Sequence, residues 1–183
     1  MKKIIITIIG PDKPGIIASV SDTLFKKGCN IENVSQTTLQ SEFAGICVVS
    51  IPEDLTIETL RESMNKDLEG KGLHVHIKAL EDAEPALKES AESFIISTCG
   101  PDKKGLVARI SKVIAEAGVN ISNLKAVFEG GTNPDRNIMI FEVDVPGWVD
   151  VQALSVTLKH LASELNLDLT LQHKNIFDAV NRI

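Results

Sequence analysis

The sequence predicts an α+β protein made of two consecutive ferredoxin-like units, each a four-stranded antiparallel sheet with two helices on one face. Three observations support this prediction. The chain has 183 residues, enough for two small domains. Its halves repeat at an offset of 90 residues, with 11 identities in the 27 positions from Gly10 to Gln36. Each half has the order βαββαβ, which right-handed crossovers turn into such a sheet.

In the first half, hydrophobic periodicity separates strands from helices. Strands are short, β-branched runs with a period of two, and helices place apolar residues three and four positions apart. Gly28 is expected to end the first helix, and Thr56 or a neighbouring residue is expected to cap the second. The expected elements are a strand at 3–9, a helix at 14–27, strands at 30–40 and 44–51, a helix at 56–68 and a strand at 73–78.

The second half repeats the order, and an insertion in the turn-rich segment "EGGTNPDRN" shifts the later offset to 94. The expected elements are a strand at 94–98, a helix at 104–117, strands at 120–129 and 138–145, a helix at 151–165 and a strand at 167–172. The domains are therefore expected at 1–81 and 92–183, the second with a C-terminal tail. Residues 82–91 are charged and read as a linker.

The central strands of the first sheet are apolar on both faces. Ile5 and Ile9 alternate with Ile4, Ile6 and Ile8, and in the third strand Ile46 and Val48 alternate with Cys47, Val49 and Ile51. A sheet with one wet face would alternate between apolar and polar residues. We therefore expect the outer face to be covered, either by the other unit or by a second chain, and we predict a homodimer.

Composition excludes several partners. The net charge is −6 and no run of Lys and Arg is present, so no direct binding to nucleic acid is expected. The apolar run that follows Lys2 and Lys3 covers only Ile4–Ile9, which is too short for a signal peptide or a membrane span. We therefore expect a cytoplasmic protein without a membrane partner.

Residue types that often carry chemistry are sparse. Cys29, Cys47 and Cys99 form no CxxC pair and are read as small core residues. His74 and His76 share one strand face without a third ligand, so no metal site is predicted. No nucleophile, base and orienting group occur together, so the chain is predicted to be neither an enzyme nor a cofactor binder.

The motif Gly-Pro-Asp-Lys-x-Gly stands at the first strand-to-helix corner of each half. Free backbone N–H groups at a helix N-terminus attract an anion, and glycine allows close approach. The Asp can cap the helix or face an ammonium group, and the Asn that opens the next strand adds an amide. Together these groups describe a site for a free α-amino acid. The candidate ligand-binding residues are Gly10, Pro11, Asp12, Lys13, Gly15, Ile16, Asn30 and Ile31, and Gly100, Pro101, Asp102, Lys103, Gly105, Leu106, Asn120 and Ile121.

A purely structural interpretation of the corner stands beside this one. Gly-Pro-Asp is favourable turn chemistry, and Asp is a good N-cap, so the motif needs no ligand to explain it.

The segments "GPDKPGIIASVSDTLFKKGCNIENVSQ" and "GPDKKGLVARISKVIAEAGVNISNL" resemble the ACT domain, a small regulatory module. The tandem arrangement is similar to the glycine cleavage system transcriptional repressor family. The resemblance implies ligand loops at Gly10–Gly15 and Gly100–Gly105, faced by Asn30 and Asn120, at interfaces between ACT modules.

The resemblance further implies a non-enzymatic regulatory protein that senses a small amino acid of the glycine or serine type and acts through a regulatory protein partner. Transcriptional control of amino-acid metabolism is one such role. The alternative is an interaction module without a small-molecule ligand. The copies differ where Pro14 aligns with Lys104, Cys29 with Val119 and Gln36 with Ala126. These differences leave open whether both corners bind.

Overall fold

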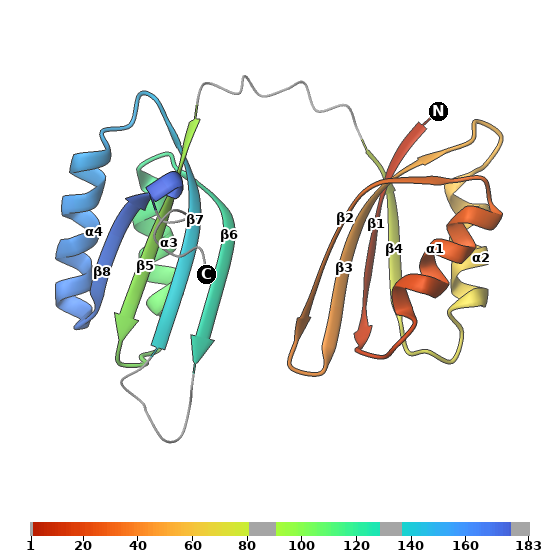
Figure 1. Cartoon of the computed structure of the whole chain (residues 1–183), viewed down its shortest axis with the longest axis horizontal. Coiled ribbons are helices and arrows are strands. Elements are labelled where there is room, and N and C mark those ends of the chain that lie inside the picture. Colours follow the sequence, from red (N-terminus) through yellow and green to blue (C-terminus); the bar gives the residue numbers. More distant parts are fainter. Residues whose placement is uncertain (1, 81–90, 129–136, 177–183) are drawn as a thin grey trace. The chain divides into compact units, whose positions relative to one another are not determined.

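The computed structural model describes residues 2–80, 91–128 and 137–176 (Figure 1). The chain divides into two compact units, Met1–Ala86 and Leu87–Ile183. Each unit is described by itself. The predicted linker at 82–91, except for Ala91, lies outside the described residues, as do 129–136 of the inserted loop and residues 177–183 of the predicted tail.

The first unit is a four-stranded antiparallel sheet with the strand order β2-β3-β1-β4. Both helices pack on one face of this sheet (Figure 1). The observed elements are β1 (Lys2–Pro11), α1 (Ile16–Lys26), β2 (Asn30–Leu39), β3 (Glu42–Ile51), α2 (Ile57–Asp67) and β4 (His74–Ala79).

The second unit repeats this topology with the order β6-β7-β5-β8. The predicted fold class, two tandem ferredoxin-like units, is therefore confirmed. The observed elements are β5 (Ala91–Gly100), α3 (Leu106–Glu116), β6 (Asn120–Phe128), β7 (Asn137–Pro146), α4 (Val151–Leu165) and β8 (Asp168–His173).

Local sequence explains where the helices end. Gly28 follows α1 with φ 68°, and its N–H donates to the Phe25 carbonyl while the Cys29 N–H donates to the Leu24 carbonyl. This pair of bonds is the Schellman motif, and α3 ends in the same way at Gly118. Thr56 caps α2 as predicted, because its side chain accepts a hydrogen bond from the Thr59 N–H.

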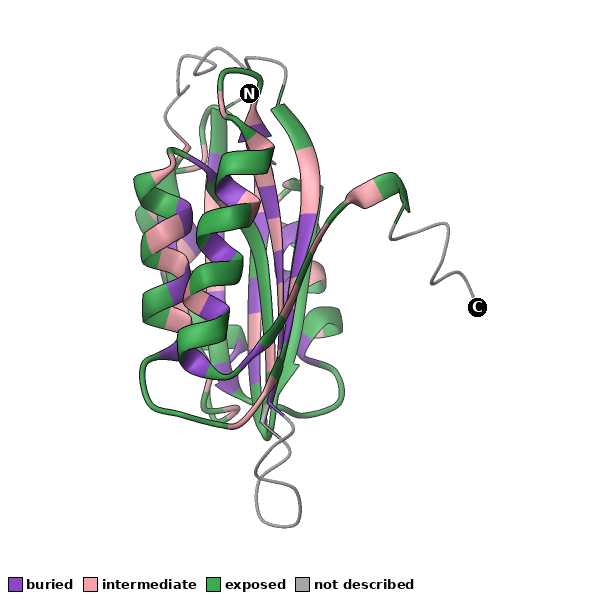
Figure 2. Ribbon diagram, turned by 90° about the vertical axis from the view of Figure 1, so that its left-hand side faces the viewer, coloured by how far each residue is buried: buried purple, intermediate pink, exposed green. Residues whose placement is uncertain are grey.

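The core of each unit lies between the sheet and the helices, where the buried residues of Figure 2 gather. In the first unit, Ile4, Ile6 and Ile8 of β1 pack against the apolar faces of the two helices. The alternation predicted for β4 is also present, since Ile77 is buried while His74 and His76 are exposed.

The outer sheet faces differ between the two units. In the first, Ile9 is 50% exposed and Ile46 is 46% exposed, so the apolar outer face is open within that unit. In the second, Ile95 takes the place of the partly buried Ile5 and is only 3% exposed, while Cys99, in the place of Ile9, is exposed. Ile95 pairs with Glu142 on one side and Gln172 on the other. Lys174 forms an ion pair with Glu142, with 2.7 Å between Nζ and Oε2.

The cysteines only partly match the prediction of core positions. Cys47 is buried and Cys29 is partly buried, but Cys99 is exposed. The prediction for Cys99 is wrong because Thr98 occupies the inner face of β5 and its neighbour must point outward. Among the described residues, no helix is long and apolar enough to cross a membrane.

Candidate functional site

The first corner is a tight turn between β1 and α1. A Cβ on Gly10 would lie 2.5 Å from the carbonyl oxygen of Gly72, so only glycine fits there. The Asp12 N–H donates to the Ser41 carbonyl at 2.8 Å, which ties the turn to the hairpin between β2 and β3. The Asp12 side chain is exposed. The packing thus fixes the backbone of the turn and leaves its polar side chains at the surface.

Both corner helices begin at a glycine and not at the preceding aspartate. Gly15 and Gly105 are the N-caps, with φ of 89° and 87°, and no side chain caps either helix. The possibility that Asp12 or Asp102 caps its helix is therefore wrong. The left-handed glycine also makes α1 and α3 start two residues later than predicted. The first-turn N–H groups consequently lack a side-chain acceptor, as an anion site requires.

Some candidate residues can contribute only their backbone. Ile16 and Leu106 are 4% and 2% exposed, and their side chains belong to the cores. Ile31 and Ile121 also pack against the cores. Since these side chains face away from solvent, a ligand at the corner would meet their N–H and C=O groups instead.

The sheet register separates Asn30 from the corner of its own unit. Gly10 pairs with Phe43, whereas Asn30 pairs with Ser50, seven positions further along β3. This spacing corresponds to about 23 Å along the strand. Asn120 is equally far from its own corner, since it pairs with Asp144 while Gly100 pairs with Asn137. Within one unit, therefore, Asn30 and Asn120 do not face Gly10–Gly15 and Gly100–Gly105.

The second corner is more strongly tied than the first. The Asn137 amide nitrogen donates to Asp102 Oδ1 at 3.3 Å. Lys103 Nζ donates to the Leu165 carbonyl at 3.0 Å, which satisfies one of the last carbonyls of α4. Asn137 is 2% exposed and Thr98 is 1% exposed, so buried polar side chains lie next to this corner. Neither residue was a candidate in the sequence analysis. The repeat aligns Asn137 with Phe43 and Thr98 with Ile8, which are both apolar.

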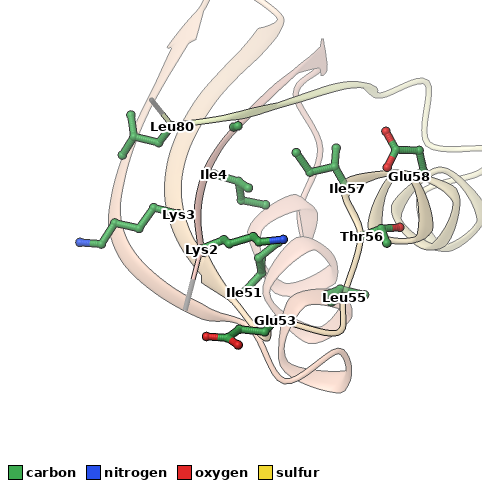
Figure 3. Close-up of a pocket in the computed structure, with 11 residues that line it drawn as sticks. Lys2, Lys3, Ile4, Ile51, Glu53, Leu55, Thr56, Ile57, Glu58 and Leu80 are labelled. Atoms are coloured by element: carbon green, nitrogen blue, oxygen red, sulfur yellow. The ribbon is translucent and has the colours of Figure 1, made fainter. Parts of the chain in front are cut away.

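A hollow of about 740 Å³, also absent from the sequence predictions, lies at the opposite end of the first sheet, near the N-terminus of α2 (Figure 3). Its floor is apolar, from residues such as Ile4 and Ile51, and charged side chains surround it. Lys2 reaches into the hollow while Lys3 points away (Figure 3) and forms an ion pair with Glu32 at 2.7 Å. Both signs of charge are present, so no single ligand chemistry follows.

Reactive groups are few in the part of the chain that the structure describes. Burial raises the pKa of the Cys29 and Cys47 thiols, which keeps both protonated and unreactive near neutral pH. Among residues 2–80, 91–128 and 137–176, no group of three potential metal-ligating side chains converges.

Two known structures are similar to this chain over most of its length. A structure of an unknown protein from Galdieria sulphuraria has a TM-score of 0.78 at 21% identity, and covers 94% of this chain and 98% of that one. A structure of a putative glycine cleavage system transcriptional repressor has a TM-score of 0.70 at 18% identity, with 93% and 96% covered. At these identities the likeness concerns the fold.

Among sequence relatives, a UPF0237 protein of Methanopyrus kandleri is 38% identical over 79 residues, which are 43% of this chain and 88% of that protein. A phosphoserine phosphatase of Mycobacterium tuberculosis is 25% identical over 170 residues, 92% of this chain but only 40% of the enzyme. The family model described as the ACT domain matches residues 2–78 and 92–172, so the chain belongs to the ACT domain family, with one module in each unit.

Proposed function

We propose that this protein is a non-enzymatic regulator that binds a small amino acid at a corner between strand and helix and passes the signal to a protein partner. The observation that carries the proposal is the pair of helices that start at left-handed glycines without a side-chain cap. Such a start presents free N–H groups and the positive end of the helix dipole to a carboxylate. The exposed Asp12 and Asp102 supply a negative charge for the ammonium group.

The register supports a site completed by a second module. Asn30 is about 23 Å along the strand from its own corner, so it can join a corner only if that corner belongs to another module. A ligand held in this way would bridge two modules. Its binding would favour one packing of the modules over another, which is how a small ligand can control the docking of a partner.

The ligand is expected to be small and its affinity modest. The best tiny ligands gain at most about 1.5 kcal/mol per non-hydrogen atom, so glycine, with five, is limited to about 7.5 kcal/mol, or roughly micromolar affinity. Two relatives suggest the first ligands to test. One similar structure is named for a glycine cleavage system repressor and one relative for phosphoserine, which makes glycine and serine the first choices.

Isothermal titration calorimetry of the full chain against single amino acids tests the proposal. We expect saturable heat with glycine or serine, and none with the amino-acid amide, which lacks the carboxylate. Asp12→Asn together with Asp102→Asn should weaken binding while leaving the melting temperature nearly unchanged, because neither carboxylate caps its helix. Absence of heat with all twenty amino acids would refute the proposal.

The second candidate function is a protein-interaction module without a small-molecule ligand. The open apolar outer face of the first sheet, with Ile9 and Ile46 about half exposed, favours this function. It predicts a stable complex with a partner protein that free amino acids neither strengthen nor weaken.

A further inference from the structure

Two buried oxygen atoms of the second unit, Thr98 Oγ1 and Asn137 Oδ1, have no hydrogen-bond partner among the described residues. Thr98 is on β5 and pairs with Met139, and Asn137 opens β7 and pairs with Gly100. The two side chains are therefore diagonal neighbours on the helix-facing side of the sheet, next to the corner. Buried polar atoms are rarely left unpaired, and such a pair points to a missing partner.

The first unit has an apolar corner at the same register. Ile8 stands in place of Thr98, and Phe43, which pairs with Gly10, stands in place of Asn137. Both are buried core residues. The Phe43 ring lies over Gly45, whereas Met139 fills the equivalent position in the second unit. The space can thus be filled without polar atoms, so packing does not require Thr98 and Asn137.

The hydrogen bond to Asp102 determines that the unpaired atom of Asn137 is its carbonyl oxygen, an acceptor. A carboxylate only accepts, so the Asn137 amide must turn its NH₂ group toward Asp102 Oδ1, and its carbonyl oxygen is left as an acceptor. The Thr98 hydroxyl can also accept. Asp102, Asn137 and Thr98 therefore offer three acceptors beside the uncapped start of α3, and an ammonium group has three donors.

We infer that the second corner, and not the first, holds the amino acid, with its ammonium group at Asp102, Asn137 and Thr98 and its carboxylate at the first turn of α3. This inference rests on the proposed function and specifies where it resides. The carboxylate of Asp102, which is exposed, neutralises the ammonium, and the two buried neutral oxygens complete its shell. The first corner, lined by Ile8 and Phe43, lacks this shell and serves a structural role.

Calorimetry of the full chain with glycine and with serine tests the inference. We expect one ligand per chain. The variant Thr98→Val with Asn137→Leu keeps side-chain size but removes all three polar functions, and should lose at least about tenfold in affinity. The matched variant of the first unit, Ile8→Val with Phe43→Leu, should bind as the wild type does.

Thermal unfolding without ligand separates a ligand site from a buried water site. If both oxygens are unpaired in the protein without ligand, Thr98→Val removes an unpaired polar group and should keep or raise the melting temperature. If an ordered water satisfies them, Thr98→Val lowers the melting temperature and leaves ligand binding unchanged, which would overturn the inference.

The remaining outcomes are distinct. Two ligands per chain, or loss of binding through the first-unit variant, would overturn the inference while the proposed function stands. Heat for another amino acid in place of glycine and serine would support the inference if Thr98→Val with Asn137→Leu weakens that binding, and would overturn it if this variant binds as the wild type does. Absence of heat for every amino acid would refute both the proposed function and the inference.

Discussion

At the scale of single residues, the two glycines of each corner motif have different reasons to be glycine. Gly10 is needed because the Gly72 carbonyl would lie 2.5 Å from a Cβ. Gly15 has open space around its Cβ position, and only its φ of 89° disfavours other residues. The motif is therefore partly a packing device and partly a helix start.

This difference predicts unequal costs of substitution. Gly15→Ala should cost about 1–2 kcal/mol of unfolding free energy, the strain of a left-handed alanine. Gly10→Ala should cost about 3 kcal/mol or more, because a backbone oxygen cannot move aside as a side chain can. Urea denaturation measures both. Gly70→Ala is the matched control, since Gly70 has φ of 78° and open space, and it should resemble Gly15→Ala. Equal costs at Gly10 and Gly15 would contradict the assignment.

At the scale of elements, the sequence predicted every strand and helix because each has a clear period. Leu60 and Met64 share a helix face, and Ile4, Ile6 and Ile8 share a strand face, as expected. The geometry of the candidate site follows less directly from the sequence. The corner lies at the start of α1, whereas β2 begins just after the end of α1. Asn30 is therefore close to the motif in sequence but one helix length away in space. Asn137, which our inference adds to the site, was not a candidate because a polar residue at a strand start is typical of a loop, and its burial is known only from the structure.

Lys174, which follows β8, is tied to Glu142 of β7 by a charged contact. Glu142 accepts hydrogen bonds from Lys174 at 2.7 Å and from Asn123 at 3.0 Å. The hydrogen bond from Lys174, and then that from Asn123, lowers the pKa of Glu142 below its usual 4.5. A carboxyl whose pKa is lower in the folded state stabilises the protein above its unfolded-state pKa. That stability is lost as the pH falls through the folded-state value.

We therefore predict that Glu142→Gln lowers the melting temperature at pH 7 but has much less effect at pH 3. Differential scanning calorimetry at both pH values provides the measurement. Glu164→Gln is the control, because Glu164 forms an ion pair with Arg109 in which both side chains are 50% exposed, and such pairs contribute little. A loss of stability that is the same at pH 3 and pH 7 would show that Glu142 acts through packing alone.

At the scale of the whole molecule, the negative net charge disfavours direct binding to DNA. The net charge is −6, and proteins that neutralise phosphates need basic surfaces. We predict no binding to duplex DNA at about 150 mM salt with protein at about 10 μM, where non-specific binders already associate. Fluorescence anisotropy with labelled DNA, with and without glycine, measures this. A sequence-specific complex formed by the purified protein would contradict the prediction and remove the need for a protein partner.

The outer face of the first sheet is the feature from which we predict the oligomeric state of the protein in solution. Ile9 and Ile46 are about half exposed there, beside partly buried Ile5 and Val48. These neighbours share one sheet face, because Ile5 pairs with Val48, Thr7 with Ile46 and Ile9 with Ala44. Contiguous apolar surface of this kind marks an interaction site, and a second copy of the chain can cover it.

We predict a dimer that Ile46→Lys disrupts, since a lysine in the middle of this face would have to be desolvated on association. Sedimentation velocity over a hundredfold range of concentration should give a dimer for the wild type and a monomer for the variant. Phe25→Lys is the control, because Phe25 is 79% exposed but lies on α1, on the other side of the sheet, and should leave the dimer intact. If the wild type is a monomer at every concentration, the prediction of a dimer is wrong.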